Sequence, residues 1–192
     1  KAPAGHGGEL GLSLTRRNKQ MYALRDYRQK DIDAMPIWSR MYGFQQDAVM
    51  ANIAAMKKTT ASLSTQAPTS SGKSLMIVAI TQWFVAMTGR NVLVISPNAD
   101  ITRQNYSEFI EWGSPASIFS AKLGIKSTRH PVIFGEPVTV NNSIDRFATA
   151  NIGLVIIDEA ISTTPTNKKI ITALKGVNDK LRLIGFEAQP LK

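Results

Sequence analysis

Apolar and polar positions alternate along this chain in a way that predicts strands and helices in turn. Uninterrupted apolar runs at 91–96 and 153–158 are short and rich in β-branched residues, which is typical of strands buried on both faces of a sheet. Longer segments at 75–87 and 99–112 have the length of helices. Further strands are expected at 62–65, 115–120, 131–134 and 181–186, and a further helix at 166–177. This alternation predicts an α/β fold with a mostly parallel central sheet covered on both faces.

The segment before these elements is predicted to be mainly helical from Tyr22 to Lys58. Pro36 divides it, because proline removes a backbone donor from a helix, and Gly43 marks a second helix start. Residues 1–20 are rich in Gly, Lys and Arg and are interpreted as a flexible lead-in or the remnant of a preceding segment. We therefore expect one α/β domain over residues 21–192.

Composition and charge narrow the class of protein. With 43% apolar and 19% charged residues among 192, the composition is that of a folded chain rather than a disordered one. The absence of cysteine excludes a disulfide scaffold and a thiolate metal site, and no apolar run approaches the roughly 18 residues that span a bilayer. The net charge of +9 favours a polyanionic partner such as nucleic acid, although a basic surface without a partner has the same signature.

A candidate phosphate-binding loop joins the strand at 62–65 to the helix at 75–87. Its sequence is APTSSGKS, with Ala67 at the place of the first glycine of the general pattern. Small residues let backbone N–H groups turn onto phosphates, and the helix N-terminus behind them favours negative charge. Lys73 would reach the β- and γ-phosphates, and the Ser74 hydroxyl would bind magnesium. The residues expected to bind the nucleotide are Pro68, Thr69, Ser70, Ser71, Gly72, Lys73 and Ser74.

Two carboxylates follow the apolar strand at 153–158. In an open α/β sheet the ligand crevice lies at the carboxyl ends of the strands, which is where Asp158 and Glu159 would meet the phosphate loop. Asp158 is expected to hold magnesium, and Glu159 to polarise the attacking water. An apolar strand that ends in Asp-Glu is common on its own. Its position downstream of a Gly-Lys-Ser loop is what indicates a nucleotide hydrolase.

These segments resemble a known family. PTSSGKS, SPNADITRQ, IIDEA and IGFEAQP stand in the order of motifs I, Ia, II and III of superfamily 2 helicases, and the first resembles the loop of phage-type double-strand DNA helicases. The resemblance implies a RecA-like P-loop NTPase fold, a three-layer sandwich that uses ATP and Mg²⁺, with Lys73 and Glu159 catalytic. It also implies a nucleic-acid partner, with DNA favoured over RNA, and no membrane. The motif Ia residues expected near the nucleic-acid backbone are Pro97, Asn98, Thr102 and Gln104.

Two glutamines are candidates for the adenine-reading residue of this family. Gln29 lies in a segment that matches the motif by its letters, whereas Gln45 lies at the better distance before the phosphate loop and is favoured. A glutamine amide suits adenine because it donates and accepts at once. Phe44 beside it would stack on the base or pack in the core.

The sequence departs from the family pattern at positions that put coupling in doubt. Ile161 stands where histidine or aspartate usually links hydrolysis to movement, and it cannot make that hydrogen bond. Glu187 and Gln189 replace the hydroxyls of motif III, and Glu136 replaces a common threonine. The residues required for hydrolysis remain complete.

The resemblance also implies a second RecA-like lobe, which would supply arginines that stabilise the transition state. We expect that lobe to be missing from this chain, so that the isolated lobe hydrolyses ATP weakly or not at all. The favoured function is the ATP-binding motor lobe of a helicase or translocase in the cytoplasm, or in a host cytoplasm if the protein is viral. The alternatives are a terminase-type DNA-packaging ATPase and a nucleotide-responsive nucleic-acid-binding module that has lost coupling.

Overall fold

A computed structural model of the chain describes residues 32, 35–68, 71–160 and 164–188. Its strands are β1 (Leu63–Gln66), β2 (Asn91–Ile95), β3 (Ala116–Ser120), β4 (Ile125–Lys126), β5 (Val132–Gly135), β6 (Ile152–Asp158) and β7 (Arg182–Glu187). Its helices are α2 (Gly43–Lys58), α3 (Lys73–Thr88), α4 (Ala99–Glu111), α5 (Pro137–Asn141), α6 (Ile144–Ala148) and α7 (Pro165–Val177), with a 3-10 turn at Trp38–Arg40.

The strands form one seven-stranded sheet in the order β1-β7-β6-β2-β5-β3-β4. Every neighbouring pair is parallel except β3 and β4, which pair antiparallel at the edge. The central strands β2 and β6 consist almost entirely of buried residues, because helices cover the sheet on both faces. The predicted α/β class and the mostly parallel sheet are confirmed.

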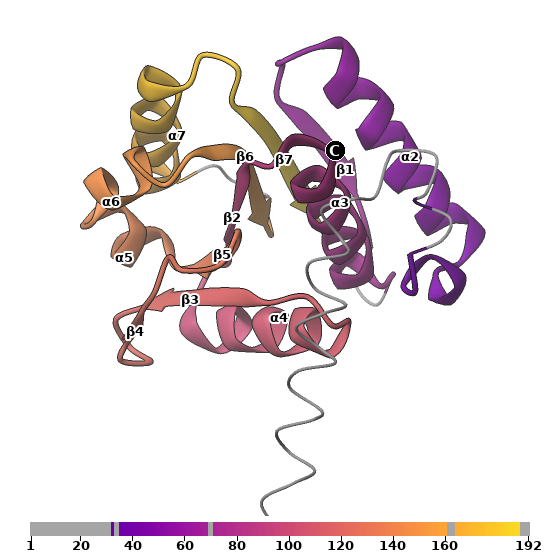
Figure 1. Ribbon diagram of the computed structural model, residues 1–192, viewed down its shortest axis with the longest axis horizontal. Helices are drawn as coiled ribbons and strands as arrows, with labels where there is room; N and C mark the ends of the chain where they lie inside the picture. Colours follow the sequence, from indigo (N-terminus) through magenta and orange to yellow (C-terminus); the bar gives the residue numbers. More distant parts are fainter. Residues whose placement is uncertain (1–31, 33–34, 69–70, 161–163, 189–192) are drawn as a thin grey trace, which may run out of the picture.

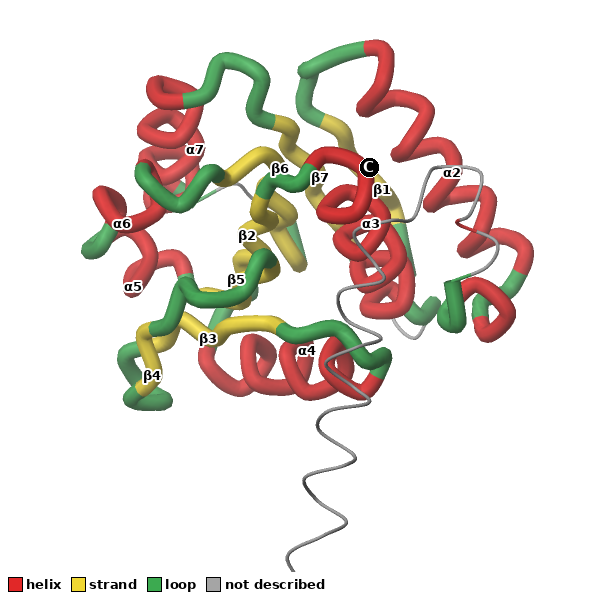
Figure 2. Tube along the Cα trace, viewed as in Figure 1, coloured by secondary structure: helices red, strands yellow, loops and turns green. Residues whose placement is uncertain are grey.

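Helices pack against both faces of this sheet and make two separate cores. Helices α2, α3 and α4 cover one face, with residues such as Ile53, Ile80 and Phe109 in its core. Helices α5, α6 and α7 cover the other face around Phe147 and Ile170. Figure 1 shows the sheet between these two sets of helices, and Figure 2 shows the same layers by secondary structure.

The predicted elements agree with this arrangement, with some corrections. Helix α2 begins at Gly43 as predicted, but residues 35–42 form turns and a short 3-10 segment rather than a helix. Pro36 accounts for this, since proline disfavours the helical region for its predecessor and removes a donor. Helices α5 and α6 and strand β4 were not predicted. They are two to five residues long, which is too short for an apolar period to be visible.

This topology places the predicted motifs at one edge of the sheet. The loop before α3 follows β1, residues 96–98 follow β2, and Asp158 ends β6. Because these strands are parallel, their carboxyl ends meet at the same edge. Among the described residues, no helix is long and apolar enough to cross a bilayer.

Candidate functional site

At one residue of the loop before α3, the backbone has a conformation that only glycine adopts without strain. Gly72 has φ 72° and ψ 36°, in the left-handed region, directly before the helix starts at Lys73. A Cβ at this position would collide with Nε2 of Gln45. The Ser71 hydroxyl is buried and has no hydrogen-bond partner among the described residues. The first N–H groups of a helix also lack intrahelical partners, so the loop offers donors to an anion.

Lys73 and Asp158 form an ion pair across the edge of the sheet. The Nζ atom of Lys73 lies 2.7 Å from Oδ1 of Asp158, and the two side chains are 19% and 4% exposed. Nδ2 of Asn105 donates a hydrogen bond of 2.9 Å to Oδ2, the other oxygen of the same carboxylate. Each oxygen therefore has a partner of its own, and the orientation of the carboxylate is fixed.

Glu159 follows Asp158 in an unusual backbone conformation. Its φ is 60°, one of two positive values among the described non-glycine residues, and its side chain is exposed. Its successor Ala160 donates a backbone hydrogen bond of 2.8 Å to Phe186 of β7, so the turn is anchored directly after the strained residue. A strained residue of this kind costs about 1–3 kcal/mol and persists only where its surroundings hold it.

These groups line one cavity of about 360 Å³ at the carboxyl edge of the sheet. Its lining consists of Gly72, Lys73, Ser74, Ile101, Gln104, Asn105, Asp158 and Glu159. The structure therefore brings together the predicted Lys73, Ser74, Asp158 and Glu159. Helix α4 forms a further wall of this cavity through Ile101, Gln104 and Asn105, and the sequence analysis did not predict that α4 lies there.

Helix α4 contacts the predicted magnesium ligands. Besides the bond from Asn105 to Asp158, the Ser74 hydroxyl donates a hydrogen bond of 2.7 Å to Oε1 of Glu108. Sequence reasoning missed both residues. The only signal was their spacing of three, which places them on the same face of the predicted helix.

Comparison with known proteins identifies the family. A model of the family described as "Type III restriction enzyme, res subunit" matches residues 39–191. The chain belongs to this family. No curated protein matches it in sequence.

Solved structures of helicases share the fold of this lobe. The UvsW helicase from bacteriophage T4 is similar with a TM-score of 0.63 and 22% identity, over 77% of this chain and 52% of that chain. A second T4 UvsW structure has a TM-score of 0.64 and 20% identity, over 94% of this chain and 40% of that chain. The E. coli DExH-box NTPase HrpB has a TM-score of 0.61 and 18% identity, over 79% of this chain and 20% of that chain. The resemblance to the RecA-like lobe of superfamily 2 helicases is confirmed, and this chain spans about half or less of each of these proteins.

In this res-subunit lobe, Gln45 holds the phosphate loop. It is 2% exposed, its Oε1 accepts the Tyr42 N–H at 2.7 Å, and its Nε2 donates to the Ser71 carbonyl. Both ends of the amide thus contact backbone, and recognition of adenine stays a prediction. Tyr42 and Phe44 are 72% and 57% exposed with parallel rings 6.1 Å apart, so Phe44 is not in the core. Thr69, Ser70 and the other candidate, Gln29, lie outside the described residues.

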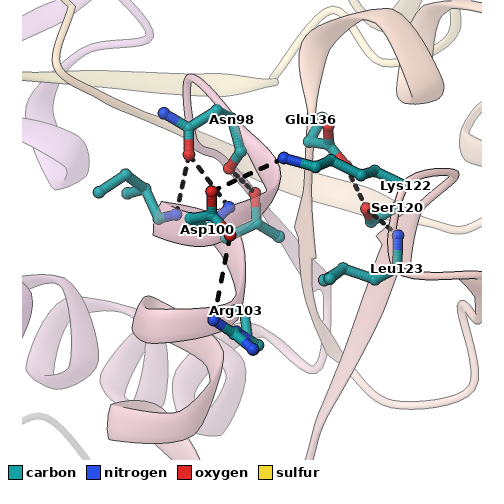
Figure 3. A network of polar contacts seen from close by, with 9 residues as sticks. Asn98, Asp100, Arg103, Ser120, Lys122, Leu123 and Glu136 are labelled. Atoms are coloured by element: carbon teal, nitrogen blue, oxygen red, sulfur yellow. Dashed lines mark hydrogen bonds and ion pairs between the residues drawn. The ribbon is translucent and has the colours of Figure 1, made fainter.

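The motif Ia residues of this lobe have different surroundings. Pro97 and Asn98 are exposed, and Oδ1 of Asn98 caps α4 by accepting the N–H groups of Asp100 and Ile101 at 3.0 Å each (Figure 3). Thr102 is fully buried and donates its hydroxyl to the Asn98 carbonyl at 2.8 Å. Its side chain therefore shapes this loop, and its contact with nucleic acid stays a prediction. The fourth predicted residue, Gln104, lines the cavity described above.

The two carboxylates that depart from the family pattern both have hydroxyl partners. Glu136 precedes α5 and accepts a hydrogen bond from the Ser120 hydroxyl at the end of β3 (Figure 3). Glu187 ends β7 and accepts a hydrogen bond of 3.0 Å from the Ser64 hydroxyl of β1. Ile161 and Gln189 lie outside the described residues, so their predicted effect on coupling stays a prediction.

Proposed function

We propose that this chain is the ATP-binding motor lobe of a nucleic-acid helicase or translocase, which couples ATP hydrolysis to movement along DNA or to its unwinding. The observation that carries the proposal is the Lys73–Asp158 pair of 2.7 Å beside an open cavity that Glu159 also lines. The family match and the helicase folds favour this function over a DNA-packaging ATPase.

The residues at the site suit ATP and magnesium. The orphaned Ser71 hydroxyl and the N–H groups at the start of α3 offer donors to phosphate oxygens. Lys73 would exchange Asp158 for the phosphates, which frees Oδ1 of that carboxylate. Ser74 and Asp158 would hold the magnesium ion, which when bound neutralises charge on the phosphates. Glu159, an exposed residue that lines the cavity, would orient the attacking water.

Adenine would bind beside the start of α2. Phe44 offers an exposed aromatic face for stacking on the base. Gln45 could read the base only by giving up one of its two backbone bonds, to Tyr42 or to Ser71. Loss of adenine discrimination in Gln45→Ala, with phosphate binding retained, would support reading by this residue.

The nucleic acid and the second lobe belong to the same proposal. Exposed Pro97 and Asn98 stand at the N-terminus of α4, whose positive end would favour a DNA phosphate, with the N–H groups of Asp100 and Ile101 already bonded to Oδ1 of Asn98. Because the chain spans 52% and 40% of the two UvsW chains, the transition-state arginines would come from a second RecA-like lobe outside it. An arginine of this kind contributes about 10³–10⁵ in rate, so we expect slow hydrolysis by this lobe alone.

ATP binding by the purified chain, and ATPase activity of the full-length polypeptide with and without DNA or RNA, test this function. We expect Lys73→Ala to abolish nucleotide binding and turnover. Lys175→Ala, an exposed lysine on α7 on the other face of the sheet, should change neither. Full activity in Lys73→Ala would show that the assigned site is wrong.

The same assay separates a second candidate, a nucleotide-responsive binding module that does no work. The specific observation in its favour is the Glu187 carboxylate, bound to Ser64, at a position where the family has a hydroxyl. This module would bind ATP and nucleic acid, yet nucleic acid would not stimulate turnover in the full-length protein.

A further inference from the structure

Helix α4 reaches both predicted magnesium ligands through side chains one turn apart. Asn105 donates to Oδ2 of Asp158 at 2.9 Å, and Glu108 accepts from the Ser74 hydroxyl at 2.7 Å. Residues three apart on a helix share a face, so one rigid element contacts ligands that come from β6 and from α3.

Asn105 extends this contact to the motif Ia loop. Its Nδ2 also donates to the Ser96 hydroxyl at 3.1 Å, and Ser96 is fully buried at the end of β2, directly before Pro97. The N-terminus of the same helix is the part capped by Asn98 (Figure 3). Asn105 therefore holds α4 against the ends of β2 and β6 at once.

We propose that Asn105 and Glu108 are positioning residues for the magnesium site, a role that rests on the nucleotide-binding function proposed above. Glu108 accepts the hydrogen bond that the Ser74 hydroxyl donates, which leaves the lone pairs of that oxygen for a hard cation. Asn105 fixes Oδ2 of Asp158, so that Oδ1, which Lys73 now holds, is the oxygen that changes partner when phosphates draw the lysine away.

Glu108 has no cation partner that would give it an ordinary structural role. None of the ion pairs within the described ranges includes it, although it is half-buried. Its one polar contact with another side chain in that part of the chain is the Ser74 hydroxyl. A second carboxylate of the same helix, Glu111, is exposed and makes no side-chain hydrogen bond or ion pair within the described residues, which makes it a matched control.

The test measures ATP affinity of the purified chain by calorimetry, once with excess EDTA and once with MgCl₂. For the wild type, magnesium should tighten ATP binding. For Glu108→Ala we expect the affinity in EDTA to stay within about twofold and the gain from magnesium to fall by about 10–100-fold, the usual effect of losing a residue that orients a metal ligand. Glu108→Gln, whose carbonyl can still accept the hydrogen bond of the serine hydroxyl, should recover part of that gain, and Glu111→Ala should behave as wild type.

Asn105→Ala gives the second half of the test and should lose the magnesium gain as Glu108→Ala does. If these variants bound ATP more weakly by the same factor in EDTA and in magnesium, or if their ATP affinity changed in neither, the positioning role would be overturned. The nucleotide site would still stand. A wild-type chain that binds no ATP would overturn both proposals, and an unchanged Lys73→Ala would point to a nucleotide site elsewhere. Where Glu108→Ala fails to fold, Asn105→Ala decides, since a normal gain in ATP affinity from magnesium in that variant contradicts the proposal.

Discussion

Two halves of the carboxyl edge of the sheet use polar side chains in different ways. In the nucleotide half, at the ends of β1 and β6, Lys73 pairs with Asp158 and the Ser74 hydroxyl bonds to Glu108, and the first three of these residues line a cavity. In the outer half, at the ends of β2, β3 and β5, Asn98 accepts backbone N–H groups of α4, and Ser120 bonds to the Leu123 N–H and to Glu136 (Figure 3). The first arrangement has groups that a ligand can take over, and the second is already satisfied.

The two halves also differ in how much depends on a single residue. The nucleotide half holds a carboxylate that is 4% exposed, and a group so deeply buried is costly to leave without a partner. The outer half holds Asp100, Arg103 and Lys122, each more than 60% exposed and joined by ion pairs of 3.7 and 3.9 Å. Substitutions should therefore have large effects in the first half and small effects in the second.

The largest effect is expected from Gly72→Ala. The alanine would have to adopt a left-handed backbone conformation, and its Cβ would also collide with Gln45. Gly89→Ala would meet the same backbone strain, but no atom lies within 4 Å of its added Cβ. Strain alone costs about 1–2 kcal/mol, and overpacking adds about 1–3 kcal/mol. Urea unfolding should thus show a larger loss for Gly72→Ala, together with loss of ATP binding that Gly89→Ala does not share.

A double variant sharpens this test. Gln45→Ala removes the group that the new Cβ would strike, so adding it to Gly72→Ala should cost less stability than adding it to the wild type. Strictly additive losses would show that Gln45 does not pack against the loop.

Much of the nucleotide half was predictable from sequence, because a run such as 153–158, short and rich in β-branched residues, favours a strand buried on both faces. The Gly-Lys-Ser turn and the Asp-Glu pair then meet at one edge for topological reasons. Asn105 and Glu108 could not be assigned, since a polar residue on a helix usually faces solvent and only the packing of α4 beside α3 turns these inward. Thr102 shows the opposite case: its motif position predicts a contact with nucleic acid, which stays a prediction, and its buried hydroxyl donates to the Asn98 carbonyl at the helix start.

A moderate effect is expected at the helix cap of the outer half. Asn98→Ala removes the acceptor of two N–H groups and should destabilise the chain by about 1 kcal/mol in urea unfolding. Asn98→Asp keeps the cap and should retain stability. If Asn98 lies against DNA phosphates, Asn98→Asp should nevertheless weaken DNA binding in fluorescence anisotropy. Unchanged DNA affinity in this folded variant would place the nucleic acid elsewhere.

The smallest effect on stability is expected from Asp100→Ala. Its two ion pairs are exposed and longer than 3.5 Å, so their loss should change the free energy of unfolding by less than about 0.5 kcal/mol. The same change frees Arg103 and Lys122 and removes one negative charge from the outer half. DNA affinity should therefore rise, with a steeper dependence on salt, because more counterions are released on binding. Asp179→Ala, exposed in the turn before β7 at the other edge of the sheet, removes the same charge and is the control. An equal rise in both variants would mean that net charge alone attracts DNA and that the outer half is not its binding surface.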